Sequence, residues 1–386
     1  PLPPLSDGGT SICVDQTIIL DGSRVADRGS ALEITSADNV LKGLNIANFS
    51  PNGHGISILG EDATNNAISG VGIQGCNVGI IVGEGAANNH IGFNAMPQLI
   101  KACGVYLGAG NTVSGNAADG IILLDEANNN QLNNNLIYDN GDNGIILAND
   151  SNNNTLTNNQ IWNNDGDGVL IMETSNDSIL QGNTLFDNNH GINIVGGSSN
   201  TQIGQIDAFA TMANIIAINR VYGVWVTGET TMGNAIHENQ IFMNQTGDII
   251  IEEGANNEMT PPTDLTVHLN GDITGAFAPG TTRIEIFMNN DTNFNFDFLG
   301  AIDIPVDTLE TTFIITVEDR IDPEYPDVTP ITPLPLDIVR ATATDGNGNT
   351  SPYSEPATIL EPEPEPEGEG EGEGEGEGEG EGEGTL

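Results

Sequence analysis

The stretch from Gly120 to Gly191 repeats one pattern three times. Gly120-Ile-Ile-Leu, Gly144-Ile-Ile-Leu and Gly168-Val-Leu-Ile open successive units of 24, 24 and 23 residues. Each unit then carries Asn at its ninth and sixteenth positions and Leu at its thirteenth. An apolar residue follows at the eighteenth position and an aromatic residue at the next. A period of this length is typical of repeat architectures and determines the fold.

Each unit holds short β-prone runs separated by Asn, Gly and Asp, and apolar residues recur every second position, as at Ile145 and Leu147. A single strand of this kind has nothing to cover its apolar face, whereas parallel stacking of successive units buries Ile on Ile and Leu on Leu. Asn suits the corners because it tolerates left-handed backbone and its amide hydrogen-bonds along the stack. The sequence therefore predicts an all-β parallel β-helix of about ten coils, roughly 48 Å long.

The boundaries follow from shifts in composition. We expect an N-terminal cap with the first strands in residues 1–30 and the β-helix in 31–258. Alternating strands without helical periodicity predict a small antiparallel β-sandwich in 263–359. Residues 360–386 consist mainly of Glu-Pro and Glu-Gly pairs, which predicts a disordered acidic tail.

The period is less regular outside the central units. The predicted coil openings before Gly120 are spaced 24, 24 and 25 residues apart, at Ala31, Gly55, Gly79 and Gly104. The short interval from Gly104 to Gly120 predicts a coil that is bulged or lacks one side. Surplus residues before Gly223 predict a loop or short helix projecting around 205–214.

Composition limits the partners. The chain has 55 acidic and 8 basic residues and a net charge of −47, which argues against nucleic acids and anionic membranes as partners. It contains no run of 18 apolar residues, so no membrane-spanning segment is predicted. We expect a monomer. The chain begins with Pro1 rather than Met, which is consistent with removal of a leader.

The three cysteines, Cys13, Cys76 and Cys103, are too few for a disulfide scaffold. Cys76 and Cys103 are about one coil apart in the sequence, which would allow a disulfide between them. Buried free thiols are the favoured interpretation.

Residues 1–258 resemble the right-handed parallel β-helix family of pectin-lyase-like type. The resemblance rests on Gly-Ile-x-Ile followed by Asn-x-x-Leu-x-x-Asn-x-Ile-x-x-Asn in consecutive units. Residues 263–359 look like the Ig-like module that follows such helices in surface proteins. The tail is similar to bacterial linkers that precede surface-sorting signals. The resemblance implies a secreted or cell-surface bacterial protein, but the family includes lyases, hydrolases, epimerases, adhesins and non-catalytic proteins.

The sequence offers few catalytic residues. Hydrolases of this fold combine a Gly-His-Gly with an Asp-Asp pair and an Arg-x-Lys, and here only Gly53-His54-Gly55 is present. Lyases need a basic residue, for which Arg220 beside the irregular coil is the best candidate. The negative charge of the chain also disfavours catalysis on an acidic polysaccharide.

Paired carboxylates hydrolyse neutral glycans when about 5 Å, or 6.5 to 9.5 Å, separate them. Asp139 and Asp187 share one repeat position, and Asp119 and Asp167 share another. Two coils separate the members of each pair, or roughly 9.6 Å. The favoured alternative is that Asp and Asn alternate at these positions because both fit turns.

Tyr138, Trp162 and Phe186 occupy equivalent positions and predict a stacked aromatic ladder about 10 Å long. Facing outward beside Asn163, the ladder would be a platform for sugar rings; facing inward, it would belong to the core. The preceding apolar residues favour the outward orientation by alternation, but the corner that follows allows either.

Asp345, Asn347 and Asn349 alternate with Gly, as in half of a calcium loop. The favoured alternative is a Gly-rich hairpin turn. Calcium is the only cofactor that the sequence indicates.

The sequence thus favours a non-catalytic, adhesin-like protein that presents an Asn/Asp-rich face to a polysaccharide or cell-surface glycan. The alternatives are a polysaccharide lyase or glycoside hydrolase of the same fold, and a structural rod without a ligand.

Overall fold

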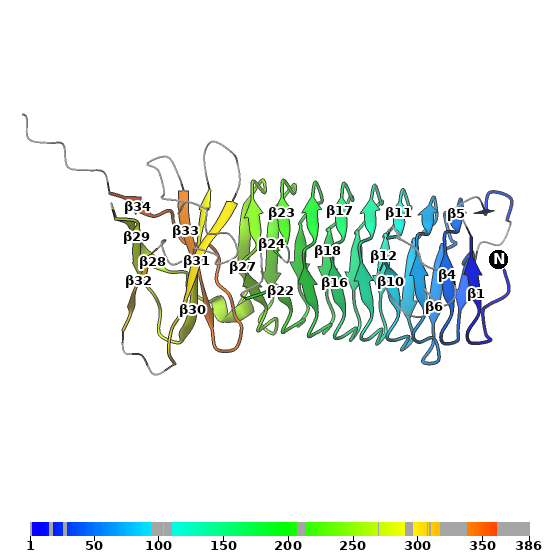
Figure 1. Cartoon of the computed structure of the whole chain (residues 1–386), viewed down its shortest axis with the longest axis horizontal. Coiled ribbons are helices and arrows are strands. Elements are labelled where there is room, and N and C mark those ends of the chain that lie inside the picture. The colour runs from blue at the N-terminus through cyan, green and yellow to red at the C-terminus, as the bar shows by residue number, and fades with distance from the viewer. Residues whose placement is uncertain are drawn as a thin grey trace, which may run out of the picture.

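The computed structural model describes a rod with a smaller β-module at its C-terminal end (Figure 1). The described residues are 2–14, 18–25, 29–93, 103, 110–206, 213–268, 270–289, 296–306, 308, 310–316 and 338–360. The predicted tail and most of the predicted projecting loop lie outside these residues.

Three parallel sheets of nine strands each form the rod. In chain order, every coil adds one strand to sheet B, then one to sheet C, then one to sheet A. Sheet B contains β1 (Ser11–Cys13), β4 (Val40–Lys42), β7 (Ala67–Ser69), β10 (His90–Gly92), β13 (Gln131–Asn133), β16 (Thr155–Thr157), β19 (Ile179–Gln181), β22 (Gln202–Gly204) and β25 (Ala235–His237). Sheet C contains β2 (Ile19–Asp21), β5 (Asn45–Ala47), β8 (Gly72–Gln74), β11 (Thr112–Ser114), β14 (Leu136–Tyr138), β17 (Gln160–Trp162), β20 (Thr184–Phe186), β23 (Ile215–Ala217) and β26 (Gln240–Phe242). Sheet A contains β3 (Leu32–Ile34), β6 (Ile56–Leu59), β9 (Ile80–Gly83), β12 (Ile121–Leu123), β15 (Ile145–Leu147), β18 (Val169–Ile171), β21 (Ile192–Ile194), β24 (Tyr222–Thr227) and β27 (Gly247–Glu252).

The register of the strands stacks residues of the same kind on one another in adjacent coils. Ile121 pairs with Ile145, which pairs with Val169, and all three are at most 1% exposed. Burial of such columns from all three sheets forms one continuous core inside the rod. The predicted all-β parallel solenoid is therefore confirmed, with nine strands in each sheet.

One predicted coil boundary is wrong. Gly104 itself lies outside the described residues, but the coil after the one that Gly79 opens begins at Gly120. Ile80 of β9 pairs with Ile121 of β12, and the Gly79 N–H donates to the Asp119 carbonyl. The coil that starts at Gly79 therefore continues to Gly120. Its extra residues lie between β10 and β11, so no coil has lost a side. The 25 residues from Gly79 to Gly104 matched the repeat in length, but no other evidence supported a coil boundary at Gly104.

The disulfide does not join Cys76 and Cys103, the pair that the sequence spacing would allow. Cys13 of β1 forms a disulfide with Cys103, across 90 residues of sequence. Cys76 is free and buried, as the favoured interpretation expected for it, and burial raises its pKa to about 11. Cys103 therefore lies beside β1 at the N-terminal end of the rod, which its one-coil spacing from Cys76 did not indicate.

Buried asparagines form columns at all three corners. At the corner between sheets B and C, the column consists of Asn111, Asn135, Asn159, Asn183, Asn214 and Asn239. At the corner between sheets C and A, it consists of Asn116, Asn140, Asn164, Asn188, Asn219 and Asn244. At the corner between sheets A and B, it begins with Asn39, Asn66, Asn89, Asn130 and Asn154.

Asn159 shows how a column works. Its Oδ1 accepts from the backbone N–H and the Nδ2 of Asn135, at 3.0 and 2.9 Å. Its Nδ2 donates to Asn183 Oδ1 at 3.0 Å and to the Leu132 carbonyl at 2.9 Å. The side chain is 0% exposed, and its amide oxygen and nitrogen each make two hydrogen bonds. The column thus satisfies corner backbone groups that would otherwise be buried without partners.

The C-terminal module contains two small sheets around a separate core. A 3-10 helix, η2 (Ala255–Glu258), closes the rod before it. One sheet contains β32 (Thr312–Thr316), β29 (Asp272–Ala276), β28 (Thr263–Val267) and β34 (Thr358–Ile359). The other contains β31 (Phe296–Asp303), β30 (Thr281–Asn289) and β33 (Ile338–Asp345). The Ig-like identity of this module stays a prediction.

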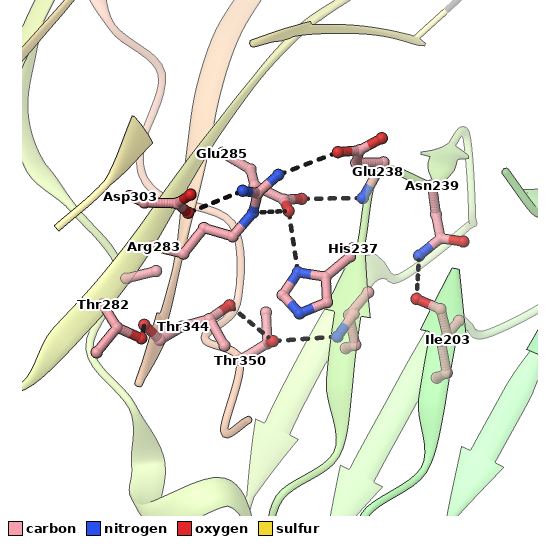
Figure 2. A network of polar contacts seen from close by, with 12 residues as sticks. Ile203, His237, Glu238, Asn239, Thr282, Arg283, Glu285, Asp303, Thr344 and Thr350 are labelled. Atoms are coloured by element: carbon pink, nitrogen blue, oxygen red, sulfur yellow. Dashed lines mark hydrogen bonds and ion pairs between the residues drawn. The ribbon is translucent and has the colours of Figure 1, made fainter. Parts of the chain in front are cut away.

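A buried polar network joins the module to the last coil (Figure 2). Glu285 of β30 accepts from His237 Nδ1 at 2.9 Å and from Arg283 Nε at 2.8 Å. Arg283 also donates to Glu238 at 3.0 Å and to Asp303 at 2.9 Å. We call these five residues the latch. The Ile236 N–H of edge strand β25 donates to the Thr350 hydroxyl, so the module also covers an open sheet edge.

Among the described residues, no helix is long and apolar enough to span a membrane.

We expect Asn159→Leu to lower the free energy of unfolding by at least about 3 kcal/mol. Leu has a similar volume but leaves two buried donors and one buried carbonyl without partners. Urea denaturation followed by circular dichroism measures the change. Gln160→Leu, one residue later and exposed on the outer face, is the matched control and should stay within about 0.5 kcal/mol of wild type. Equal stability of both variants would contradict this account of the column.

We expect the latch to weaken in acid. Burial raises the pKa of Glu285, but hydrogen bonds and charge from His237 and Arg283 outweigh burial and hold this pKa below its ordinary value of 4.5. A lowered folded pKa means that the stabilisation is present above about pH 4.5 and is lost as the pH falls further. Glu285→Gln should be less stable than wild type at neutral pH, and its melting temperature should fall less between pH 5 and pH 3.

Asp303→Asn is the control for this comparison, because the Asp303 side chain contacts the same Arg283 but is 80% exposed. Its acid profile should follow that of wild type. Parallel profiles for wild type and Glu285→Gln would rule out the latch as the acid-sensitive contact.

Candidate functional site

The aromatic ladder lies on the outer face of sheet C. Tyr138 and Trp162 stack with ring centroids 4.4 Å apart and planes at 10°, and Trp162 and Phe186 stack at 5.8 Å and 4°. The preceding residues of the same strands are 0% exposed, whereas the three rings are partly exposed. Strand alternation therefore holds as far as the corner, and the rings face outward.

Polar turn residues flank the ladder. Asp139, Asn163 and Asp187 follow the three rings, and each is exposed with a φ between 52° and 56°. Asn163 Nδ2 donates to Asp139 Oδ1 at 2.6 Å. Carboxylate and amide groups therefore border a flat apolar strip, which suits a ligand that has both ring faces and hydroxyls.

Asp139 and Asp187 do not form an isolated carboxylate pair. Asn163 occupies the coil between them, and both lie in exposed turns with left-handed backbone. The turn interpretation accounts for both residues, because Asp and Asn tolerate this conformation best among non-glycine residues.

Asp119 and Asp167 lie beside the first strand residues of sheet A and are nearly buried. Asn143 connects them: it donates its backbone N–H and Nδ2 to Asp119 Oδ1, both at 3.0 Å, and its Oδ1 accepts from the Asp167 N–H at 2.8 Å. Asp142 is close to both carboxylates. Burial and the charges of Asp119, Asp167 and Asp165 raise its pKa.

Asp167 belongs to a cluster that the sequence interpretation missed. Its Oδ1 accepts from His190 Nδ1 at 2.7 Å and its Oδ2 from Asn193 Nδ2 at 2.8 Å. Burial raises the pKa of Asp167, but the hydrogen bonds from His190 and Asn193 outweigh it, and this pKa lies below its ordinary value. The His190 ring contacts Tyr222 and Trp225, with centroids 5.4 and 5.0 Å away. The carboxylate thus fixes the imidazole with Nδ1 protonated, as in sites where the other nitrogen acts as a base.

The signal for this pair is present in the sequence. Asp167 and His190 both precede a coil-opening glycine, in consecutive coils. Equivalent positions of adjacent coils are neighbours in a β-helix, so the contact follows from the register. Tyr222 precedes the next opening glycine and extends the same column.

Arg220 follows Asn219 at the corner between sheets C and A. It is exposed, and its guanidinium donates to the backbone carbonyl of Asn164, two coils away. This contact makes Arg220 a brace along the corner.

The predicted calcium ligands form a tight turn. Asp345 Oδ1 accepts from the Asn347 N–H at 2.8 Å, and Asp345 Oδ2 accepts from Asn349 Nδ2 at 2.8 Å. Asn349 Oδ1 accepts from the Gly233 N–H of the rod at 2.7 Å. These oxygens already serve the turn and its docking. In the part of the chain that the structure describes, no group of three His, Cys, Asp or Glu side chains is arranged to hold a metal ion.

The comparisons with solved structures find alginate epimerases and a phage tailspike protein. A variant of the periplasmic alginate epimerase AlgG shares 18% identity with a TM-score of 0.44, over 61% of this chain and 54% of that one. The chain therefore spans about half the length of that epimerase. The A-module of the Azotobacter vinelandii mannuronan C-5 epimerase AlgE6 shares 14% identity with a TM-score of 0.43, over 65% and 74%. A tailspike protein of E. coli bacteriophage HK620, in complex with a pentasaccharide, shares 10% with a TM-score of 0.30, over 88% and 57%.

No curated protein matches the chain significantly. A family profile described as "Right handed beta helix region" matches residues 10–208, which is more than half of the chain. The protein belongs to the right-handed β-helix family.

Proposed function

We propose that the protein binds a polysaccharide without cleaving it, through the aromatic ladder on sheet C. The supporting observation is the outward stack of Tyr138, Trp162 and Phe186, bordered by exposed amide and carboxylate groups. Large aromatic rings left partly exposed in a contiguous strip are typical of binding surfaces. Their mutual stacking holds the rings parallel before any ligand arrives, which lowers the entropy cost of binding.

The charge of the protein favours a neutral ligand. With 55 acidic and 8 basic residues, it repels polyuronates unless cations intervene. A neutral glycan meets no such barrier, and its hydroxyls can donate to Asp139 and Asp187.

We place the protein outside the cytoplasm, as a secreted or cell-surface protein. The Cys13–Cys103 disulfide supports this location, because disulfides persist mainly in oxidising compartments.

The second candidate is a carbohydrate-active enzyme, either a polysaccharide lyase or a glycoside hydrolase. The observation that favours it is the Asp167–His190 pair with Asn193, Tyr222 and Trp225 around it. A histidine oriented by a buried carboxylate is suited to general acid–base chemistry. Binding remains the preferred function because His190 is only 7% exposed.

We expect Trp162→Ala to weaken binding of neutral polysaccharides roughly 10- to 30-fold, because a central aromatic anchor typically contributes about 1.4 to 2 kcal/mol. Affinity electrophoresis on glucan, mannan and xylan gels measures the effect. Trp225→Ala, the other tryptophan of the chain, is the matched control and should bind like wild type. Equal loss in both variants, or no loss in either, would contradict a site on sheet C.

We also expect no release of reducing ends or unsaturated sugars from these polysaccharides or from alginate and polygalacturonate. Turnover by the wild type that disappears in His190→Gln and falls by orders of magnitude in Asp167→Asn would establish the enzyme instead. Turnover that persists in both variants would exclude this cluster as its source.

A further inference from the structure

A groove adjoins the ladder on the same face of sheet C. It has a volume of about 520 Å³ and extends over β2, β5, β8 and β11 to the Tyr138 side chain. Tyr138 is therefore both the first ring of the ladder and a wall of the groove.

The groove exists because the outward residues become small on this side of Tyr138. The ladder column continues from Tyr138 through Ser114, Gln74 and Ala47 to Asp21, one residue per coil. In the parallel column on the same face, the ladder coils carry Thr184, Gln160 and Leu136. The next two coils carry Thr112 and Gly72, so the side chains become smaller from Leu136 to Gly72. The outer surface of sheet C is therefore lower over these small side chains than over the stacked rings, and the groove begins beside Tyr138.

Gly72 keeps the hollow open. A Cβ built on Gly72 would lie 2.4 Å from Asn45 Oδ1, closer than non-bonded atoms approach. The Asn45 side chain therefore lies over the Gly72 backbone, and a larger residue at position 72 would displace it. The amide of Asn45 consequently lines the groove instead of filling it.

The lining combines polar groups with apolar ones such as Ile19, which is 61% exposed, and it carries little charge. Gln74, Thr112 and Ser114 contribute an amide and two hydroxyls, and all three are at least partly exposed. Asp21 is the single carboxylate of the lining. Hydrogen bonds from Asn48 Nδ2 at 3.0 Å and the Ser23 N–H at 2.9 Å lower its pKa and hold it in place as a charged acceptor. This set of groups suits hydroxyl-rich ligands. No described residue of the lining is Lys or Arg, but Arg24 is close enough for its charge to lower the pKa of Asp21 further.

Among the described residues, the other end of the ladder carries fewer such groups, with the amide of Gln240 on β26 as one of them. Beyond Phe186 the column continues as Ala217, and the flanking residues are Ile218 and Met243, which are 57% and 51% exposed. A glycan that stacks on the rings finds more hydrogen-bonding partners on the Tyr138 side and a more apolar surface on the Phe186 side.

We propose that the groove is the second half of a binding track for a linear, neutral polysaccharide that runs parallel to the axis of the rod. The proposal rests on the polysaccharide-binding function above. Sugar rings stack on the ladder, and the continuing chain enters the groove, where Gln74, Thr112, Ser114 and Asp21 bind its hydroxyls. From β2 to β20 the track extends over six inter-strand spacings, or about 29 Å. A long oligosaccharide therefore uses both halves, whereas a disaccharide occupies only the ladder.

Isothermal titration calorimetry on the full chain tests the track, with cellohexaose and mannohexaose as long probes and cellobiose and mannobiose as short ones. Thr112→Trp fills the groove and leaves the ladder intact. It should reduce the affinity for a bound hexasaccharide by about tenfold and leave that for the disaccharide unchanged. Thr155→Trp, at the first position of β16 on sheet B, is the matched control and should have no effect. Circular dichroism confirms folding of each variant.

The variant Gln74→Ala/Asp21→Asn gives an independent answer if Thr112→Trp folds poorly, since it removes hydrogen-bonding groups without adding bulk. It should lower hexasaccharide affinity several-fold and spare the disaccharide. Unchanged affinities in both groove variants, with binding lost in Trp162→Ala, would overturn the track and leave the ladder function standing. Failure of all four probes to bind the wild type would overturn both proposals.

Discussion

The hydrogen bonds between corner asparagines of adjacent coils are the constraint on which this structure depends. A β-helix turns three times per coil, and every turn brings backbone N–H and C=O groups into a nearly dry interior. The amide of each column residue, such as Asn159, accepts from one coil and donates to the next, so the corner is satisfied without water. Since each amide needs an identical neighbour one coil away, the columns also prevent the coils from slipping past one another.

This register converts repeat positions into surface columns. A residue type that recurs every 24 positions becomes a line of side chains along the rod, spaced about 4.8 Å apart. The aromatic ladder, the Asp–Asn–Asp border beside it and the Asp167–His190 contact all arise in this way. A ligand with its own linear repeat, such as a polysaccharide, matches this geometry better than a compact molecule does. The C-terminal module hydrogen-bonds to Ile236 and Glu238 at β25, the last strand of sheet B, so this sheet has a defined end on that side.

The sequence correctly predicts the features that recur with the 24-residue period. Predictions from it are wrong where an insertion interrupts that period. The core columns and the three aromatic positions follow from alternation within a 24-residue unit. The single long coil from Gly79 to Gly120 was interpreted as two coils, because Gly104 lies within it at about the spacing of one repeat. The Cys13–Cys103 disulfide joins residues 90 positions apart, and the latch joins the last coil to the C-terminal module, so no local pattern encodes either. The contact between Asp167 and His190 was predictable in principle. It becomes visible only when turn residues at equivalent positions of adjacent coils are compared.

The fluorescence of Trp162 as the sole tryptophan tests the central claim most directly. The chain has two tryptophans, so Trp225→Phe leaves Trp162 in the ladder and Trp162→Phe leaves Trp225 beside His190. Titration of both variants with a neutral hexasaccharide should produce a saturable shift of the Trp162 emission and no change at Trp225. A saturable change confined to Trp225 would contradict the account and place the glycan on sheet A.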